Sequence, residues 1–212
     1  MTAGALALLA FAAIAAVGDW VAVARRDKRL EYLCKPLTMA FLIGVAATVD
    51  VDASNVRTWF IVALALSLLG DVFLMLPRDA FIPGLVSFLL GHVAFIVGMW
   101  ADGVGFLTFA LGLTLAAVAV LVVGGRIIRA VRTSDQPDMG TPVGAYMTVI
   151  SLMLASAIGT EEPLAIGGAA LFFCSDALIA WERFVKPRAW HRLAIIVTYH
   201  VAQAGLTLSL VT

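Results

Sequence analysis

Apolar residues along this chain gather in eight long runs that are separated by short polar turns. A transmembrane helix needs about 20 consecutive, mostly apolar residues, and each run reaches or approaches that length. The pattern therefore predicts an all-α, polytopic membrane protein with eight transmembrane helices in a single domain, residues 1–212. We expect the helices at residues 2–24, 33–49, 57–76, 81–100, 103–124, 142–158, 162–182 and 190–211.

The composition supports the same class. Hydrophobic residues make up 62% of the chain and charged residues only 13%, which is unlike an ordinary soluble domain. No polar stretch is long enough to form a separate soluble domain. The two cysteines, Cys34 and Cys174, have no CxxC spacing, so we expect buried thiols rather than a zinc site or a disulfide.

The basic residues flank alternate turns of this eight-helix arrangement. Thirteen of the fourteen Lys and Arg residues lie at the odd-numbered turns, whereas the even-numbered turns carry Arg57, Asp50, Asp52, Asp102, Glu161 and Glu162. By the positive-inside rule the odd-numbered turns are cytoplasmic and both termini are outside, in a membrane that we expect to be the bacterial inner membrane. The first apolar run is followed rather than preceded by basic residues, which favours a retained helix over a signal peptide.

A weak internal repeat relates the two halves of the chain. Pro36 is expected at the start of the second helix and Pro142 at the start of the sixth. Asp71 and Asp176 follow these prolines by 35 and 34 residues, near the ends of the third and seventh helices. A histidine follows in the next helix of each half. With four helices in each half, such a repeat would be parallel.

Six ionisable side chains fall inside the apolar runs: Asp19, Asp71, His92, Asp176, Glu182 and His200. An ionisable residue at membrane depth costs a few kcal/mol, so each is first read as a functional candidate. Asp71 lies about five residues, roughly 7 Å, from the cytoplasmic end of its helix, and Asp176 has nearly the same depth. We therefore expect a pocket that opens toward the cytoplasmic leaflet.

The six candidates differ in their structural alternatives. Asp19 and Glu182 lie near helix ends, where Arg25 or Arg183 can neutralise them, so we expect structural roles for both. For the two histidines, a hydrogen-bonded packing role and a chemical role remain equally open. Asp71 and Asp176 can also be a staple between helices that share a proton, but each lies more than a turn inside its helix.

Two desolvated carboxyl groups in one cavity have a defined chemistry. Burial and mutual repulsion leave one of them protonated, so that it acts as an acid. Its ionised partner can activate water or stabilise a cationic intermediate. This division suits acid-catalysed cleavage through an oxocarbenium-like state. Such a mechanism requires the third and seventh helices to lie close together.

Several segments resemble the lysoplasmalogenase (YhhN-like) family of membrane proteins. The resemblance covers the chain from about residue 30 to the C-terminus, and the order and spacing of the segments carry it. The segments are Lys35-Pro36-Leu37, Gly70 to Leu74, Gly84 to Phe88, Gly91 to Phe95, Tyr146 leading into Ser151, Gly168 to Asp176, Arg183-Phe184, Tyr199 and Ala202-Gln203.

The resemblance implies hydrolysis of the vinyl ether bond of a lysophospholipid, with release of a fatty aldehyde and a glycerophospho-head group. It implies no metal or organic cofactor, lipid as the partner and no nucleic acid. Asp71 and Asp176 would be the catalytic pair. Lys35 and Arg183, at the cytoplasmic rim, would hold the phosphate. The remaining supporting residues are His92, Tyr146, Tyr199 and Gln203, with His200 added on its depth alone.

Two other functions compete with this one. A metal-dependent membrane hydrolase would use Asp71, Asp176, His92 and His200 as ligands, although the chain has no HxxH or HxxxH pair and only three histidines. A proton-coupled transporter would use the same residues to relay protons. A purely structural scaffold is disfavoured by the number of polar residues at matched depth.

Overall fold

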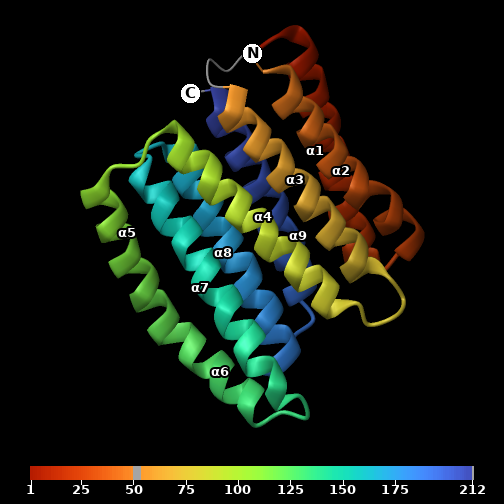
Figure 1. The fold of residues 1–212 in the computed structure, drawn as a ribbon. Helices are drawn as coiled ribbons and strands as arrows, with labels where there is room; N and C mark the ends of the chain where they lie inside the picture. Colours follow the sequence, from red (N-terminus) through yellow and green to blue (C-terminus); the bar gives the residue numbers. More distant parts are fainter. Residues whose placement is uncertain (50–53, 212) are drawn as a thin grey trace.

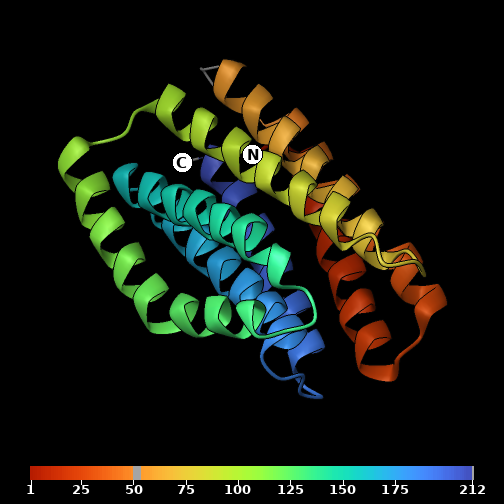
Figure 2. The same cartoon turned by 60° about the horizontal axis from the view of Figure 1, so that its bottom comes forward.

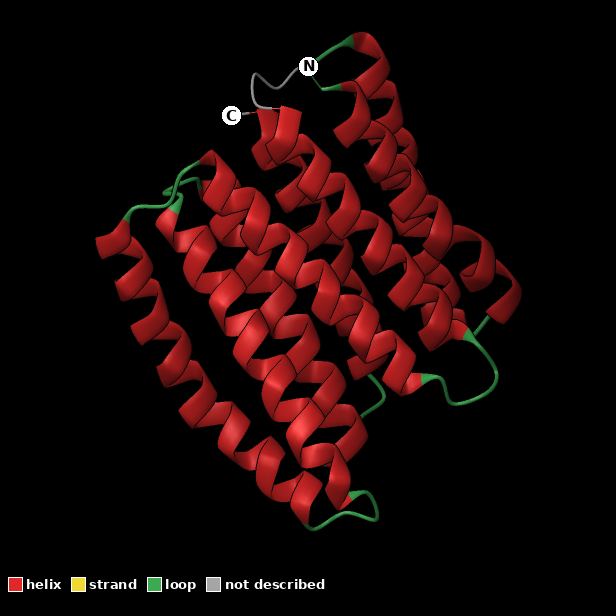
Figure 3. Cartoon of the chain, viewed as in Figure 1, coloured by secondary structure: helices red, strands yellow, loops and turns green. Residues whose placement is uncertain are grey.

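The computed structural model describes residues 1–49 and 54–211, and these residues form an all-helical bundle (Figure 3). Within that part of the chain, eight helices are long and apolar enough to cross a membrane. The predicted fold class is therefore confirmed, and the chain is an integral membrane protein. Seven spans are continuous: α1 Ala3–Arg25, α2 Lys28–Thr48, α3 Ser54–Met75, α4 Phe81–Asp102, α7 Gly140–Gly159, α8 Pro163–Phe184 and α9 His191–Leu208.

The second span begins earlier than its apolar run suggests. Asp27 precedes α2, and its side chain accepts hydrogen bonds from the backbone N–H groups of Arg29 and Leu30, which caps the helix at Lys28. Pro36, expected to open this helix, instead lies inside it. The additional N-terminal turns hold charged residues, so hydropathy alone did not reveal them.

The fifth span is longer than predicted and is bent. It consists of α5 Phe106–Ala119, a π-helical segment η1 Val120–Gly124 and α6 Gly125–Arg132. The bend between α5 and α6 is plain in Figure 2, where α6 turns back toward the bundle. A Cβ atom on Gly124 would overlap the methyl group of Met147 on α7, so the π-helical segment approaches its neighbour at a residue without a side chain.

The helices pair in the same order in the two halves of the chain. In the first half α1 packs on α2, α2 on α3, and α3 on α4; in the second half α5 packs on α7, α7 on α8, and α8 on α9. The halves join where α4 meets α7 and where α9 meets α2. Figure 1 shows α5 at one edge of the bundle and α9 behind α3 and α4. Because consecutive helices also pack together in an up-and-down bundle without a repeat, the parallel four-helix repeat stays a prediction.

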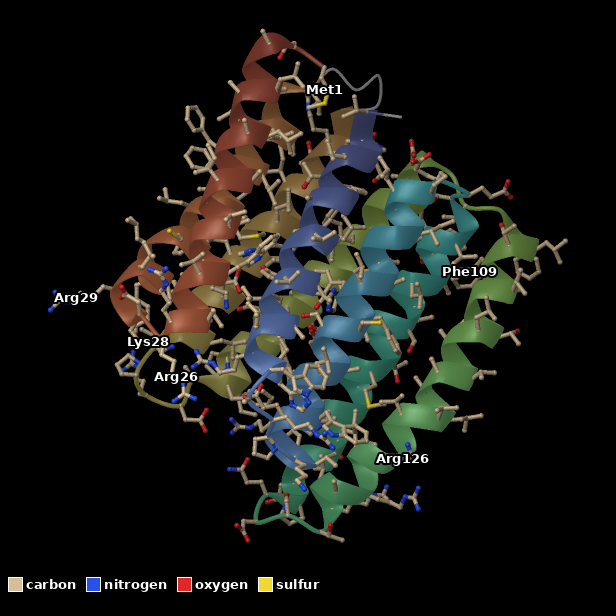
Figure 4. The ribbon with its side chains drawn as sticks, turned by 180° about the vertical axis from the view of Figure 1, so that it is seen from behind. Met1, Arg26, Lys28, Arg29, Phe109 and Arg126 are labelled. Carbon is tan, nitrogen blue, oxygen red and sulfur yellow. The ribbon has the colours of Figure 1, made fainter. Side chains whose placement is uncertain are left out.

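The turns that carry the Lys and Arg residues lie at one end of the bundle. Figure 4 shows Arg26, Lys28, Arg29 and Arg126 toward the end away from Met1, and Figure 1 shows the two termini near each other at the opposite end. Two acidic residues of the topology argument, Asp50 and Asp52, lie outside the described residues.

The outer surface carries apolar side chains, as expected for a surface in contact with lipid. Phe106 and Leu107 of α5 are both 82% exposed. Cys174, which was expected to be buried, is also exposed, because α8 turns this side chain away from its helix neighbours; Cys34 is buried as expected. Small residues allow the tightest helix contact: a Cβ on Gly168 of α8 would lie 2.9 Å from the carbonyl oxygen of Ala202 on α9.

Candidate active site

Asp176 lies at the centre of a buried polar cluster that joins three helices. Its Oδ2 atom accepts a 2.5 Å hydrogen bond from the hydroxyl of Tyr146 on α7. Nε2 of His92 on α4 lies 3.1 Å from the same carboxylate oxygen and 2.8 Å from the tyrosine hydroxyl. The exposed fractions of His92, Tyr146 and Asp176 are 0%, 8% and 9%. Three of the residues singled out in the sequence are therefore in direct contact.

Asp71 lies in a second cluster, in which an ion pair replaces the histidine. The ammonium of Lys35 on α2 is 3.1 Å from Oδ1, and the hydroxyl of Tyr199 on α9 donates a 2.6 Å hydrogen bond to Oδ2. Asp71 is 1% exposed, and the Lys35 side chain is 14% exposed. Lys35 was expected at the rim as a phosphate ligand, but here its ammonium is bound to Asp71. Gln203, fully buried, lies one turn after Tyr199 on α9.

Aromatic rings fill the space between the two clusters. Phe172 packs edge-to-face against His92, with ring centroids 4.6 Å apart, and against Tyr199 at 5.4 Å. Phe88 packs against Tyr199 at 5.8 Å. Edge-to-face packing of this kind fixes ring orientation and thereby holds the tyrosine hydroxyl and the imidazole in place. The two carboxylates are therefore supported by one continuous rigid core.

Both carboxylates line one polar cavity of about 370 Å³. α3 packs on α2 and α4, and α8 packs on α7 and α9, so Asp71 and Asp176 reach the cavity from different walls. The cavity is also lined by the basic residues Lys28, Lys35, Arg183 and Arg192, and by Glu31 and Glu182. The close packing of the third and seventh spans that this mechanism was expected to require is not found among the described residues, because α3 and α8 are separated by their neighbours; the two aspartates share only the lining of this cavity.

A second, smaller cavity of about 60 Å³ is also lined by Asp176. Leu74, Phe81 and Phe88 line both spaces, and the rest of the smaller cavity is lined mainly by apolar side chains of η1, α6, α7 and α8. Gly124 of the π-helical segment is among them. The arrangement offers a charged compartment and an apolar compartment that share one carboxylate.

Arg183 lies at the edge of the polar cavity, where it closes the α3–α4 turn against α8. Its guanidinium is 2.9 Å from Oδ2 of Asp79 and stacks on the ring of Phe81, with its central carbon 4.0 Å from the ring centroid. This hydrogen-bonded cation lowers the pKa of the Asp79 carboxyl below its usual value. Arg183 therefore neutralises Asp79, and not Glu182 as the sequence suggested.

The other two candidates from the sequence, Asp19 and His200, form a separate buried pair. Nε2 of His200 lies 3.9 Å from Oδ2 of Asp19, and the indole N–H of Trp20 donates a 3.2 Å hydrogen bond to Nδ1 of His200. The four residues considered as metal ligands are thus divided between sites. Among the described residues, no group of three or more His, Cys, Asp and Glu side chains has a metal-binding arrangement.

Sequence reasoning missed three residues of the polar cavity. Lys28, Glu31 and Arg192 form an ion-pair group at its edge, with Lys28 2.8 Å and Arg192 3.4 Å from the Glu31 carboxylate. The available signal was their position at the predicted cytoplasmic ends of the second and eighth spans. Lys28 and Arg192 were interpreted only as topogenic charges, and Glu31 was not singled out.

A comparison with protein families matches the part of the chain that contains the two clusters. The model of the YhhN family matches residues 30–210, and that range contains both aspartates and every side chain that contacts them. The chain belongs to the YhhN family. Asp19 and Lys28 lie before the matched range, whereas Glu31 and Arg192 lie within it.

Two curated relatives extend this assignment to the YhhN family. Human lysoplasmalogenase TMEM86B is 35% identical over 147 residues, which are 69% of this chain and 61% of the human protein. The lysoplasmalogenase of Mycobacterium bovis is 31% identical over 175 residues, 80% of this chain and 66% of that protein. The chain thus spans less than two thirds of the length of its human relative. No solved structure matches this YhhN-family chain.

Proposed function

We propose that this protein is a lysoplasmalogenase-like hydrolase that cleaves the vinyl ether bond of a lysophospholipid. The observation that carries the proposal is that Asp176 lines both the polar and the apolar cavity. In a lysoplasmalogen the vinyl ether lies between a charged glycerophospho-head group and a single aliphatic chain. A lipid with its head group in the polar cavity and its chain in the apolar one has that bond at the carboxylate.

The two aspartates take different roles in this mechanism. Asp71 is paired with the Lys35 ammonium and acts as the carboxylate that activates water or faces the cation. Asp176, held by Tyr146 and His92, carries the proton and acts as the acid. The names of the human and mycobacterial relatives support hydrolysis of this class of lipid.

The reaction needs one proton, one water and no cofactor. Asp176 transfers its proton to the vinyl carbon farther from the ether oxygen, and the π electrons form the new C–H bond. The resulting oxocarbenium ion is captured at its other carbon by water, whose proton passes to a carboxylate. The hemiacetal then loses its hydroxyl proton to a carboxylate as its C=O bond forms and its bond to the glycerol oxygen breaks. The glycerol oxygen takes up a proton from the other carboxyl group, so that the fatty aldehyde and the glycerophospho-head group are released.

Residues next to the two carboxylates support these steps. Tyr146 and His92 orient Asp176, and His92 returns a proton to it after transfer. Tyr199 orients Asp71, and Gln203 supports the water from the next turn of α9. His200, next to Tyr199 on α9, has a supporting role, since its buried Nδ1 accepts a hydrogen bond from the indole N–H of Trp20.

The proposed orientation places both termini outside and opens the polar cavity to the cytoplasmic leaflet of the bacterial inner membrane. Its support is the position of the basic residues at the end away from Met1, which Figure 4 shows for Arg26, Lys28, Arg29 and Arg126.

A lipid panel tests the function. Purified protein in detergent is given 1-alkenyl, 1-alkyl and 1-acyl lysophospholipids with the same head group and chain length, and aldehyde release is measured. We expect turnover of the alkenyl lipid alone. Fatty acid release from the acyl lipid, without aldehyde from the alkenyl lipid, would replace the proposal by an esterase activity.

A further inference from the structure

A buried glutamate at the edge of the polar cavity holds two basic residues from opposite parts of the chain. Glu31, in the first turn of α2, has a side chain that is 7% exposed. The ammonium of Lys28 is 2.8 Å from Oε2, and the guanidinium of Arg192 on α9 is 3.4 Å from both carboxylate oxygens. One carboxylate therefore positions two cations side by side.

The charges of this group do not cancel. Two cations and one carboxylate give the group a net charge of +1, and all three residues line the polar cavity. The Lys28 and Arg192 side chains are 51% and 44% exposed. An anion in the cavity can therefore contact both cations while the buried Glu31 carboxylate stays in place. The arrangement has the charge and the access of a site for a singly charged anion.

The start of α9 adds to the attraction. This helix begins at His191 without a side-chain cap, whereas the start of α2 is capped by Asp27. The uncapped N–H groups of a helix N-terminus carry positive partial charge and commonly bind phosphate oxygens. Arg192, the second residue of α9, brings its guanidinium to the cavity from this same helix end.

The other two basic residues of the cavity already have carboxylate partners. Lys35 is bound to Asp71, and Arg183 is bound to Asp79 in the turn between α3 and α4. Lys28 and Arg192 also share a partner, but a single carboxylate cannot neutralise both. Among the described residues that line the cavity, the Lys28–Glu31–Arg192 group thus has one more cation than carboxylate, and a further acidic residue of the lining, Glu182, lies on α8.

We propose that Lys28 and Arg192, held by Glu31, bind the phosphodiester group of the lipid that this protein takes up. The identity of that lipid rests on the proposed function, whereas the phosphate site itself does not. A phosphodiester carries one negative charge, which matches the net charge of the group. A phosphate monoester carries nearly two, which leaves one charge without a partner in the cavity.

Binding of two probes that cannot be cleaved tests the proposal without catalysis. The probes are a 1-O-alkyl lysophosphocholine and the corresponding 1-O-alkylglycerol, which has no phosphate, both titrated into full-length protein in detergent. We expect wild type to prefer the phosphorylated probe. Arg192→Gln and Lys28→Gln should each reduce that preference about tenfold, the effect of one lost charge-assisted hydrogen bond. Arg126→Gln, on the exposed surface of α6, should leave it unchanged.

The Glu31→Gln variant gives an independent readout. It raises the net charge of the group from +1 to +2, so the preference should shift toward a 1-O-alkyl lysophosphatidic acid over the phosphocholine probe. No shift in Glu31→Gln, together with wild-type preferences in the Arg192 and Lys28 variants, would overturn the proposal.

Aldehyde release from the alkenyl lipid, measured on the same preparations, separates this inference from the proposed function. If Arg192→Gln loses the phosphate preference while even wild type releases no aldehyde, the phosphate site is supported and the vinyl ether reaction is contradicted. If wild type releases aldehyde normally and all variants keep the wild-type preference, the reaction is supported and the phosphate site is contradicted.

Discussion

The ammonium of Lys35 and the carboxylate of Asp71 form an ion pair of 3.1 Å between α2 and α3. The Asp71 side chain is 2% exposed and the Lys35 side chain 14%, so water screens the pair only weakly. This contact favours the charged form of one of the two aspartates that line the polar cavity. It also removes Lys35 from the set of cations that are available to a phosphate.

Lys35→Met should therefore act on catalysis and on stability together. Removing one partner of a buried pair leaves an uncompensated charge and costs about 3 kcal/mol or more of unfolding free energy. We expect kcat to fall more than KM rises, because the lost cation sets the state of Asp71. Steady-state kinetics of aldehyde release and thermal unfolding in detergent measure the two effects. A rise in KM with unchanged kcat would make Lys35 a phosphate ligand after all.

A double variant supplies the control for this prediction. Lys35→Met combined with Asp71→Asn removes both charges, so it should recover much of the stability that Lys35→Met loses, while remaining inactive. Equal unfolding temperatures for Lys35→Met and for the double variant Lys35→Met/Asp71→Asn would show that the ion pair contributes nothing to the stability of the fold.

Asp176→Asn and Asp71→Asn should each lower kcat by about a hundredfold or more, because an amide neither donates a proton to carbon nor accepts one from water. Circular dichroism and size exclusion check that both variants fold. Tyr146→Phe keeps the carboxylate and removes the hydroxyl contacts to Asp176 and His92, and its expected loss is about tenfold. Near-normal turnover by either asparagine variant contradicts the two-carboxylate mechanism.

Gly124 in the π-helical segment should control the length of chain that the apolar cavity accepts. Gly124→Val places a side chain against Met147, and both residues line the cavity. We expect KM to rise for long alkenyl chains and to change little for short ones. Gly125→Val is the matched control, because a Cβ at this neighbouring glycine meets nothing within 4 Å. An equal effect of both variants at all chain lengths would point to helix destabilisation alone.

Gly168 and Gly167 form a second matched pair, this time for stability. A Cβ on Gly168 would lie 2.9 Å from backbone atoms of Ala202 and Leu206 on α9, which cannot move aside as a flexible side chain can. Gly168→Ala should therefore cost about 1–3 kcal/mol. Gly167→Ala meets nothing within 4 Å and should stabilise the helix slightly, by up to about 1 kcal/mol. Thermal unfolding of both variants in the same detergent decides, and a stable Gly168→Ala protein would mean that α8 and α9 separate readily.

The bundle could be predicted from hydropathy because lipid exposure imposes long apolar runs on every span. The limits of two spans could not. Lys28–Glu31 extends α2 with charged residues, and α6 extends the fifth span with Arg126 and Arg129, because these turns lie beyond the strongly apolar runs. The bend at Val120–Gly124 lies where this span contacts α7, and no local sequence pattern indicates that contact.

Part of the candidate site was predictable in its members, but not in its pairing. Asp71 and Asp176 stood out because polar residues are costly within apolar runs, whereas their tyrosines were indicated only by the family resemblance. Nothing in the sequence tells that Lys35 reaches Asp71, or that His92 reaches Asp176 while His200 reaches Asp19, since these contacts join helices far apart in the chain. Arg183 was read as a partner for Glu182, its sequence neighbour, although the turn between α3 and α4 brings Asp79 to it.

Each carboxylate is held by one helix of its own half and one of the other. Asp71 on α3 is held by Lys35 on α2 and Tyr199 on α9, and Asp176 on α8 by Tyr146 on α7 and His92 on α4. During synthesis, Asp71 therefore has only Lys35 of these two partners until α9 has left the ribosome and joined the bundle. The polar cluster around Asp71 is thus completed only when α9 packs against the helices that precede it.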